Sequence, residues 1–200
     1  MKKVLIAFGI ILLSTTVAFA QSKVSGKVIN KSRVDKSANV AIGEGSTANM
    51  GSIKLKNSQV SGKVINESRV DKSANVAIGK GATANMGSVT MKGSNVSGKV
   101  INESRVDKSA NVAIGQGATA NMGSVTMDNS KVSGKVINKS RVDKSANVAI
   151  GQGATANMGS VTMKNSQVSG KVINESRVDK SANVAIGKGS EANMGSVTME

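Results

Sequence analysis

The side chains that could do chemistry in this sequence are Ser, Lys, Arg and Asp residues that return at a fixed interval. A serine beside a lysine can serve as nucleophile and base, but the same Ser and Lys positions recur in every copy, so an active site would be present five times. The chain has no His and no Cys, which removes the usual general bases, thiol nucleophiles and zinc ligands. We therefore expect a protein that is not an enzyme, with no catalytic residue, metal or cofactor.

Two further motifs lack the chemistry that they superficially suggest. Gly43-Glu44-Gly45 and Gly79-Lys80-Gly81 have neither the spacing nor the Lys-Ser/Thr pair of a phosphate-binding loop. Asp35 recurs in every copy, but the Gly/Asp nonapeptide of calcium-binding β-rolls is absent. Arg33 and Asp35 are two residues apart, so on a strand they would point to the same side, and we expect them to pair in a charge ladder.

The interval between copies is 36 residues. The first 20 residues of each unit are the same in all copies, except at the position of Lys31, which holds Lys or Glu. Tandem units of this size are typical of stacked architectures, in which each unit packs on the next. The units are 24–59, 60–95, 96–131, 132–167 and 168–200.

The first 20 residues differ from the units and have the pattern of an export signal. Lys2 and Lys3 precede an apolar stretch that runs from Val4 to Leu13, and Ala18-Phe19-Ala20 is a small-x-small cleavage site. A transmembrane anchor is the alternative, but the apolar stretch is short for a span of about 20 residues. We expect residues 1–20 to be a signal peptide outside the fold, 21–23 a short lead and 24–200 a secreted repeat domain with no transmembrane segment.

Within a unit, apolar residues alternate with polar ones. Ala38, Val40 and Ile42 would form one face of a strand, and Val24, Gly26 and Val28 another. Gly, Asn and Ser between these short runs supply the bends. Five identical units need five identical environments, which stacked coils provide. The sequence predicts an all-β protein: a parallel β-solenoid of five 36-residue repeats with about two turns per repeat, and ten turns spaced about 4.8 Å would make a rod roughly 50 Å long.

Stacked repeats place each residue above its own copy. Asn30, Asn39 and Asn49 would then form amide ladders, although turn-forming Asn is an alternative. The residues expected in the stacking and self-assembly core are Val24, Val28, Val34, Asn39, Val40, Ile42, Asn49, Met50, Val168, Val184, Ile186, Asn193 and Met194.

The formal net charge of +15 falls to +13 if Lys2 and Lys3 are removed. Stacking would draw the basic residues into stripes that could bind extracellular polyanions or a cell surface. The alternative is that the charge only maintains solubility and blocks sideways aggregation. Both aromatic residues lie in the predicted signal, so we expect no specific nucleic-acid recognition. The candidate polyanion-binding residues are Lys27, Arg33, Lys36, Lys63, Arg69 and Lys72.

Two resemblances add to these expectations. The segment from Asn75 to Val89, NVAIGKGATANMGSV, resembles the head repeats of trimeric autotransporter adhesins, which implies a parallel β-roll and adhesion. A signal followed by five polar, Gly/Asn/Ser-rich β repeats is similar to curlin-type functional amyloid subunits, although the curlin spacing of Ser, Gln and Asn is absent. Paired-turn units with stacked Asn also resemble fungal prion-type β-solenoids.

Three functions therefore compete. The first is a structural protein that assembles head to tail into extracellular cross-β fibres of a matrix or biofilm, because both ends present the unit that pairs inside. The second is a surface adhesin or polyanion-binding module that does not polymerise. The third, an ice-binding solenoid, would need a flat Thr array built from Thr83, Thr90 and their copies.

Overall fold

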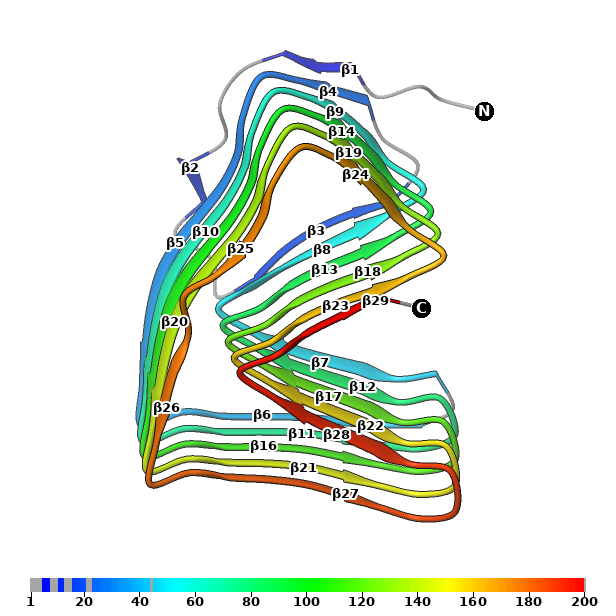
Figure 1. Ribbon diagram of the computed structural model, residues 1–200. Helices are drawn as coiled ribbons and strands as arrows, with labels where there is room; N and C mark the ends of the chain where they lie inside the picture. Colours follow the sequence, from blue (N-terminus) through cyan, green and yellow to red (C-terminus); the bar gives the residue numbers. More distant parts are fainter. Residues whose placement is uncertain (1–4, 8–10, 13–15, 21–22, 44, 200) are drawn as a thin grey trace.

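A computed structural model of the chain describes residues 5–7, 11–12, 16–20, 23–43 and 45–199 (Figure 1). These residues form strands and bends, so none of them lies in a helix that could cross a membrane. The described residues do not include Lys2 and Lys3 of the predicted signal, Gln21 after its cleavage site, or Glu44 of the Gly-Glu-Gly motif.

The repeats coil into five stacked turns, each made of one repeat. Turn 1 contains β4 (Lys23–Ser25), β5 (Val28–Asp35), β6 (Ala38–Ile42), β7 (Thr47–Met50) and β8 (Ser52–Lys56). Turn 2 contains β9 (Gln59–Ser61), β10 (Val64–Asp71), β11 (Ala74–Ile78), β12 (Thr83–Met86) and β13 (Val89–Lys92). Turn 3 contains β14 (Asn95–Ser97), β15 (Val100–Asp107), β16 (Ala110–Ile114), β17 (Thr119–Met122) and β18 (Val125–Asp128).

The last two turns repeat this order. Turn 4 contains β19 (Lys131–Ser133), β20 (Val136–Asp143), β21 (Ala146–Ile150), β22 (Thr155–Met158) and β23 (Val161–Lys164). Turn 5 contains β24 (Gln167–Ser169), β25 (Val172–Asn174), β26 (Arg177–Asp179), β27 (Ala182–Ile186), β28 (Glu191–Met194) and β29 (Val197–Met199). Equivalent strands pair in parallel and form five sheets, which we name A to E in the order β4, β5, β8, β6 and β7 of turn 1.

The parallel β-solenoid predicted from the sequence is confirmed, but the expectation of two turns per repeat is wrong. Val64 pairs with Val28 on one side and with Val100 on the other, a step of one whole repeat. An offset of half a repeat would place Asn30 above Ala48 and leave its amide without an amide partner, whereas the observed offset places it above Asn66. Five turns at about 4.8 Å make a stack roughly 20 Å high, less than half of the expected length.

Each turn has two lobes in cross-section (Figure 1). The branched lobe is enclosed by sheet A, the first half of sheet B and sheet C, and Val, Ile, Leu and Met side chains such as Val64, Leu55 and Met91 fill it. The alanine lobe lies between sheets D and E and is filled by Ala77, Ala84 and their copies. Rows of Val and Met that include Val70 and Met86 form a third buried cluster.

Three corners between strands share the same backbone conformation and residue pattern. At Lys36, Asn57 and Gly51 the backbone is left-handed, with φ of 48°, 49° and 60°, and a serine follows each of them. At the first corner, the hydroxyl of Ser37 donates to the carbonyl of Asp35 at 2.9 Å. Asn and Gly tolerate a left-handed backbone better than Lys, but Lys holds this position in all turns.

Two corners admit glycine alone, one in the row of Gly98 and one in the row of Gly115. Gly98 has a φ of 142°, and a Cβ on it would overlap the carbonyl oxygen of Gly62 in the turn before. The same close approach of backbone to backbone recurs at Gly62, Gly134 and Gly170, so these glycines are required by the stacking distance.

Three short strands precede turn 1. β1 (Leu5–Ala7), β2 (Ile11–Leu12) and β3 (Thr16–Ala20) pair in parallel with β4, β5 and β8, so their backbone lies on the edge of turn 1 (Figure 1). Among the described residues, β6 and β7 have no such partner and end sheets D and E. Removal of residues 1–20 as a signal stays a prediction, and it would leave the whole edge of turn 1 open.

Candidate self-assembly and binding surfaces

Four residues predicted for the stacking core are inside the solenoid. Val24, Val28, Val34 and Met50 are at most 7% exposed. Val24 and Val28 belong to the branched lobe, and Val34 and Met50 to the third cluster. Val168 continues the row of Val24 in turn 5, where it is half-buried against the same cluster.

The expected inner position of Val40 and Ile42 is wrong. They are 57% and 76% exposed on the outer face of β6, and Asn39 and Ala41 point inward in their place. The reason is volume, because sheets D and E lie so close that the amide of Asn75, the copy of Asn39, donates to the backbone carbonyl of Asn85 at 3.0 Å. Small side chains such as those of Ala and Asn fit between them. Val184 and Ile186 of turn 5 lie on the same outer face.

The outer face of sheet D is therefore an apolar surface. It consists of the rows that begin at Ala38, Val40 and Ile42 and continue through all five turns in register. These rows contain no charged residue, and a row of lysines that includes Lys72 borders them at the corner with sheet B. Contiguous exposed apolar surface of this kind is typical of an interaction site.

The predicted amide ladders are present. Asn66 donates its side-chain amide to Asn102 at 2.8 Å, and the row of Asn30 continues in this way to Asn174. The row of Asn39 donates in the same direction. The row of Asn49 runs the opposite way, since Asn85 donates back to Asn49 at 2.7 Å, and it ends at Asn193. These Asn residues lie within strands, so the alternative role in bends does not apply to them.

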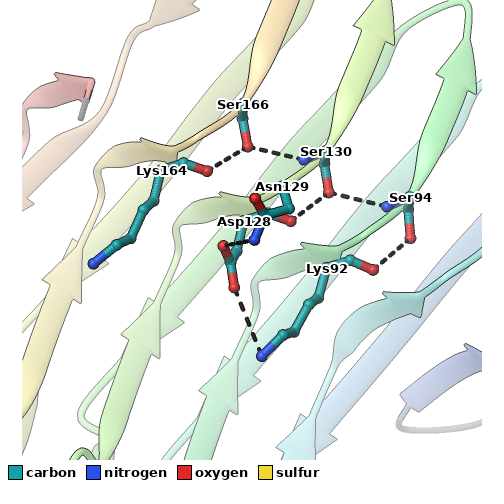
Figure 2. A network of polar contacts seen from close by, with 7 residues as sticks. All are labelled: Lys92, Ser94, Asp128, Asn129, Ser130, Lys164 and Ser166. Atoms are coloured by element: carbon teal, nitrogen blue, oxygen red, sulfur yellow. Dashed lines mark hydrogen bonds and ion pairs between the residues drawn. The ribbon is translucent and has the colours of Figure 1, made fainter.

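Serine ladders join the turns at the corners as well. Figure 2 shows the corner after β13, where the backbone N–H of Ser94 donates to the hydroxyl of Ser130 at 3.2 Å. The backbone N–H of Ser130 donates to the hydroxyl of Ser166 in the same way. Lys92 and Asp128 form an ion pair of 3.7 Å beside this ladder. The corners thus carry stacking bonds in addition to those of the sheets.

The two ends of the stack differ. The strands of turn 5 are the last in all five sheets, and the inward Met194 is 44% exposed there, whereas its neighbour Met158 is fully buried. At the other end, the side-chain oxygen of Asn30 is buried and has no hydrogen-bond partner among the described residues. The equivalent oxygen of Asn66 accepts the amide of the preceding turn.

The candidate polyanion-binding residues are exposed, but they lie in separate rows. Arg33 projects from the outer face of β5 and Lys36 follows at its end, whereas Lys27 lies before its start. Arg33 pairs in register with Arg69, so each row is a basic stripe along the stack. The second-turn residues Lys63, Arg69 and Lys72 are exposed in the same rows.

The expected pairing of Arg33 with Asp35 is wrong. Both project outward, but among the described residues no Arg–Asp pair lies within 4.0 Å. In-register stacking places Arg above Arg and Asp above Asp, while residues two apart on a strand are separated by about 6.6 Å. The ion pairs form instead where a row changes sign, as between Lys31 and Glu67 at 2.9 Å and between Lys139 and Glu175 at 3.2 Å.

A groove between the outer faces of sheets C and E holds the threonines. Thr119 and Thr155 line one wall, and Thr126 and Thr162 line the other. Thr126 donates its hydroxyl to the side-chain oxygen of Asn121 at 3.1 Å. The two Thr rows thus face each other across a groove, so the flat array that an ice-binding surface would need is not formed by them.

Two charged residues in these rows were not among the candidates predicted from the sequence. Lys54 replaces Thr in the row of Thr90, and Glu191 replaces Thr in the row of Thr83. The half-buried Lys54 donates its ammonium to the hydroxyl of Thr47 at 2.9 Å. Burial, and then the charges of Lys56 and Lys92, lower the pKa of Lys54. The signal was present in the sequence, because each replacement interrupts a row that is otherwise constant.

The described residues contain no cluster of three or more His, Cys, Asp or Glu that could hold a metal ion. No family model, no curated protein and no solved structure matches this chain. The likenesses to adhesin heads and to curlin-type subunits therefore rest on the quoted residues alone.

Proposed function

We propose that this protein is a secreted structural subunit that assembles head to tail into extracellular cross-β fibres. The observation that carries the proposal is the end of the Asn30 ladder: among the described residues the side-chain oxygen of Asn30 lacks the amide donor that each of its copies receives from the turn before, and removal of residues 1–20 would open this position, which β2 pairs with in the full chain. Turn 5 of a preceding copy would supply that donor, because Asn174 ends the same row and the row donates in this direction.

The backbone supports the same contact. The N–H groups of Val28, Val64, Val100 and Val136 all donate to a carbonyl in the following turn. Val172 occupies this position in turn 5 and so presents its N–H to the open edge. An open edge of unpaired N–H and C=O groups pairs readily with another strand, and here the complementary edge is turn 1 of the same protein.

The outer face of sheet D would let such fibres associate side by side. Its Ala, Val and Ile rows continue in register from one turn to the next and would continue across each junction. Uncharged in-register sheet faces pack as dry interfaces in cross-β assemblies. Thickening into a matrix then requires no residue beyond those already exposed.

Electron microscopy and fibre diffraction of residues 21–200 test this function. We expect unbranched filaments with a meridional reflection at about 4.7–4.8 Å, which is the spacing between strands. Val172→Pro removes the N–H donor at the open edge, whereas Val172→Ala trims the same side chain and keeps the donor. Filaments should form with Val172→Ala and be at least tenfold slower to form with Val172→Pro, at equal melting temperatures. Wild-type protein that stays monomeric at high concentration would refute the proposal.

A second function is favoured by the basic rows. The Arg33 and Lys36 rows lie close together on the solenoid and could attract a polyanion such as acidic polysaccharide or extracellular DNA. The test is retention of the slowly assembling Val172→Pro variant on immobilised heparin before filaments form, with a steep loss of binding as salt rises. Weak, salt-insensitive retention would reduce these rows to a role in solubility.

A further inference from the structure

Turn 1 and turn 5 each carry one charged residue where the other turns carry Thr. Lys54 is the first member of a row that continues with Thr90, Thr126 and Thr162. Glu191 is the last member of the facing row, which begins with Thr47. The two exceptions have opposite charges and lie at opposite ends of the stack. We propose that Glu191 of one copy and Lys54 of the next form an ion pair that selects the head-to-tail junction and its register.

The register of the sheets determines where these residues meet. Glu191 stands opposite Thr155 in sheet E, one turn after it. If the next copy continues the sheet, its Thr47 stands one step beyond Glu191, at a spacing of about 4.8 Å. The ammonium of Lys54 is already at 2.9 Å from the hydroxyl of that Thr47. The carboxylate of Glu191 would therefore arrive beside the ammonium of Lys54.

Within one chain, Lys54 is in an unfavourable environment. It is half-buried, and the nearby charges of Lys56 and Lys92 are positive, which lowers its pKa. Among the described residues it has no acidic partner within 4.0 Å. A carboxylate brought by another copy would compensate this charge, and the benefit exists only when the junction is formed.

A second row brings opposite charges to the same junction. In the row of Lys31, Lys139 forms an ion pair with Glu175 of the following turn at 3.2 Å, whereas among the described residues Glu103 and Lys139 of the following turn form none within 4.0 Å. The row begins with Lys31 and ends with Glu175, so the junction places Glu175 one turn before Lys31, in the order of Glu103 and Lys139, which matches the charges without reproducing an ion pair of the chain itself. Because both rows match only when turn 5 meets turn 1 in full register, slipped contacts would leave charges unmatched.

The inference rests on the head-to-tail function proposed above, and a charge exchange tests it separately. Lys54→Glu and Glu191→Lys each place like charges at the junction, so each variant alone should assemble about tenfold more slowly than wild type at low salt. An equimolar mixture should assemble at nearly the wild-type rate, because every junction then pairs opposite charges. The double variant Lys54→Glu/Glu191→Lys should recover as well. In about 1 M salt, where screening acts over roughly 3 Å, the differences should largely vanish.

The matched control is Thr126→Glu, which places a carboxylate in the row of Lys54 but inside the chain. It should leave the assembly rate within about twofold of wild type. Single variants that assemble as fast as wild type, or a mixture no faster than its components, would overturn the ion-pair inference and leave the fibre function intact. Wild-type protein that forms no filament would instead overturn the function itself.

Discussion

The two lobes of each turn are stabilised by different chemistry. In the branched lobe, rows of Val, Ile, Leu and Met such as Val100 and Met127 fill a wide interior by apolar burial. In the alanine lobe, sheets D and E are joined by Asn111, whose amide reaches the carbonyls of Ala84 and Asn121 at 3.0 and 3.1 Å. The larger Val112 lies outside. The difference teaches that the space between two sheets, and not hydrophobicity alone, decides which face of a strand points inward.

Loss of the Asn111 side-chain amide should destabilise the alanine lobe more than overpacking it or changing its outer face. Asn111→Ala removes the donor to three oxygens and the acceptor for Asn75; it leaves the side-chain oxygen of Asn147 and the carbonyl of Ala84 without this amide, whereas the carbonyl of Asn121 still accepts from the hydroxyl of Ser88. At roughly 1–3 kcal/mol for each unsatisfied group, we expect a loss of about 3–5 kcal/mol in the free energy of unfolding. Urea unfolding in the slowly assembling Val172→Pro background, before filaments form, measures this loss. The control Asn95→Ala changes an exposed Asn and should cost less than about 0.5 kcal/mol.

Overpacking should distinguish the two faces of one strand. Ala113→Leu inserts a larger side chain between sheets D and E and should destabilise the protein by about 1–3 kcal/mol. Ala110→Leu makes the same change on the outer face of β16, where space is available, and should be nearly neutral. Equal losses in the two variants would show that the alanine lobe tolerates a wider separation of its sheets.

The smallest effect on stability is expected on the outer face of sheet D. Val112→Thr keeps the β-branched shape and exposes a hydroxyl, so unfolding should change by less than about 0.5 kcal/mol. Together with Ile114→Thr it should nevertheless reduce bundling of filaments, which micrographs of filament width would show. Bundles of unchanged width would mean that another face mediates side-by-side contact.

The sequence was informative where every copy agrees. The repeat length, the β class and the rows of Asn30, Asn39 and Asn49 follow from periodicity, because identical units must stack on identical units. The number of turns per repeat does not follow from the periodicity. It depends on whether a strand pairs with its own copy in the next repeat or with the other half of the same repeat. The inward face of residues 38–42 was also misassigned. Alternation fixes which residues share a face, but only the narrow gap between sheets D and E shows that Asn39 and Ala41 fit inside.

Because each repeat forms one turn, the height of the solenoid is proportional to the number of repeats. A turn contacts only the turn before it and the turn after it, so insertion or loss of one whole unit leaves every remaining contact unchanged. Each added unit would lengthen the subunit by about 4.8 Å without altering its cross-section. Subunits with different numbers of units could therefore join the same fibre, provided that the terminal units keep Lys54 and Glu191.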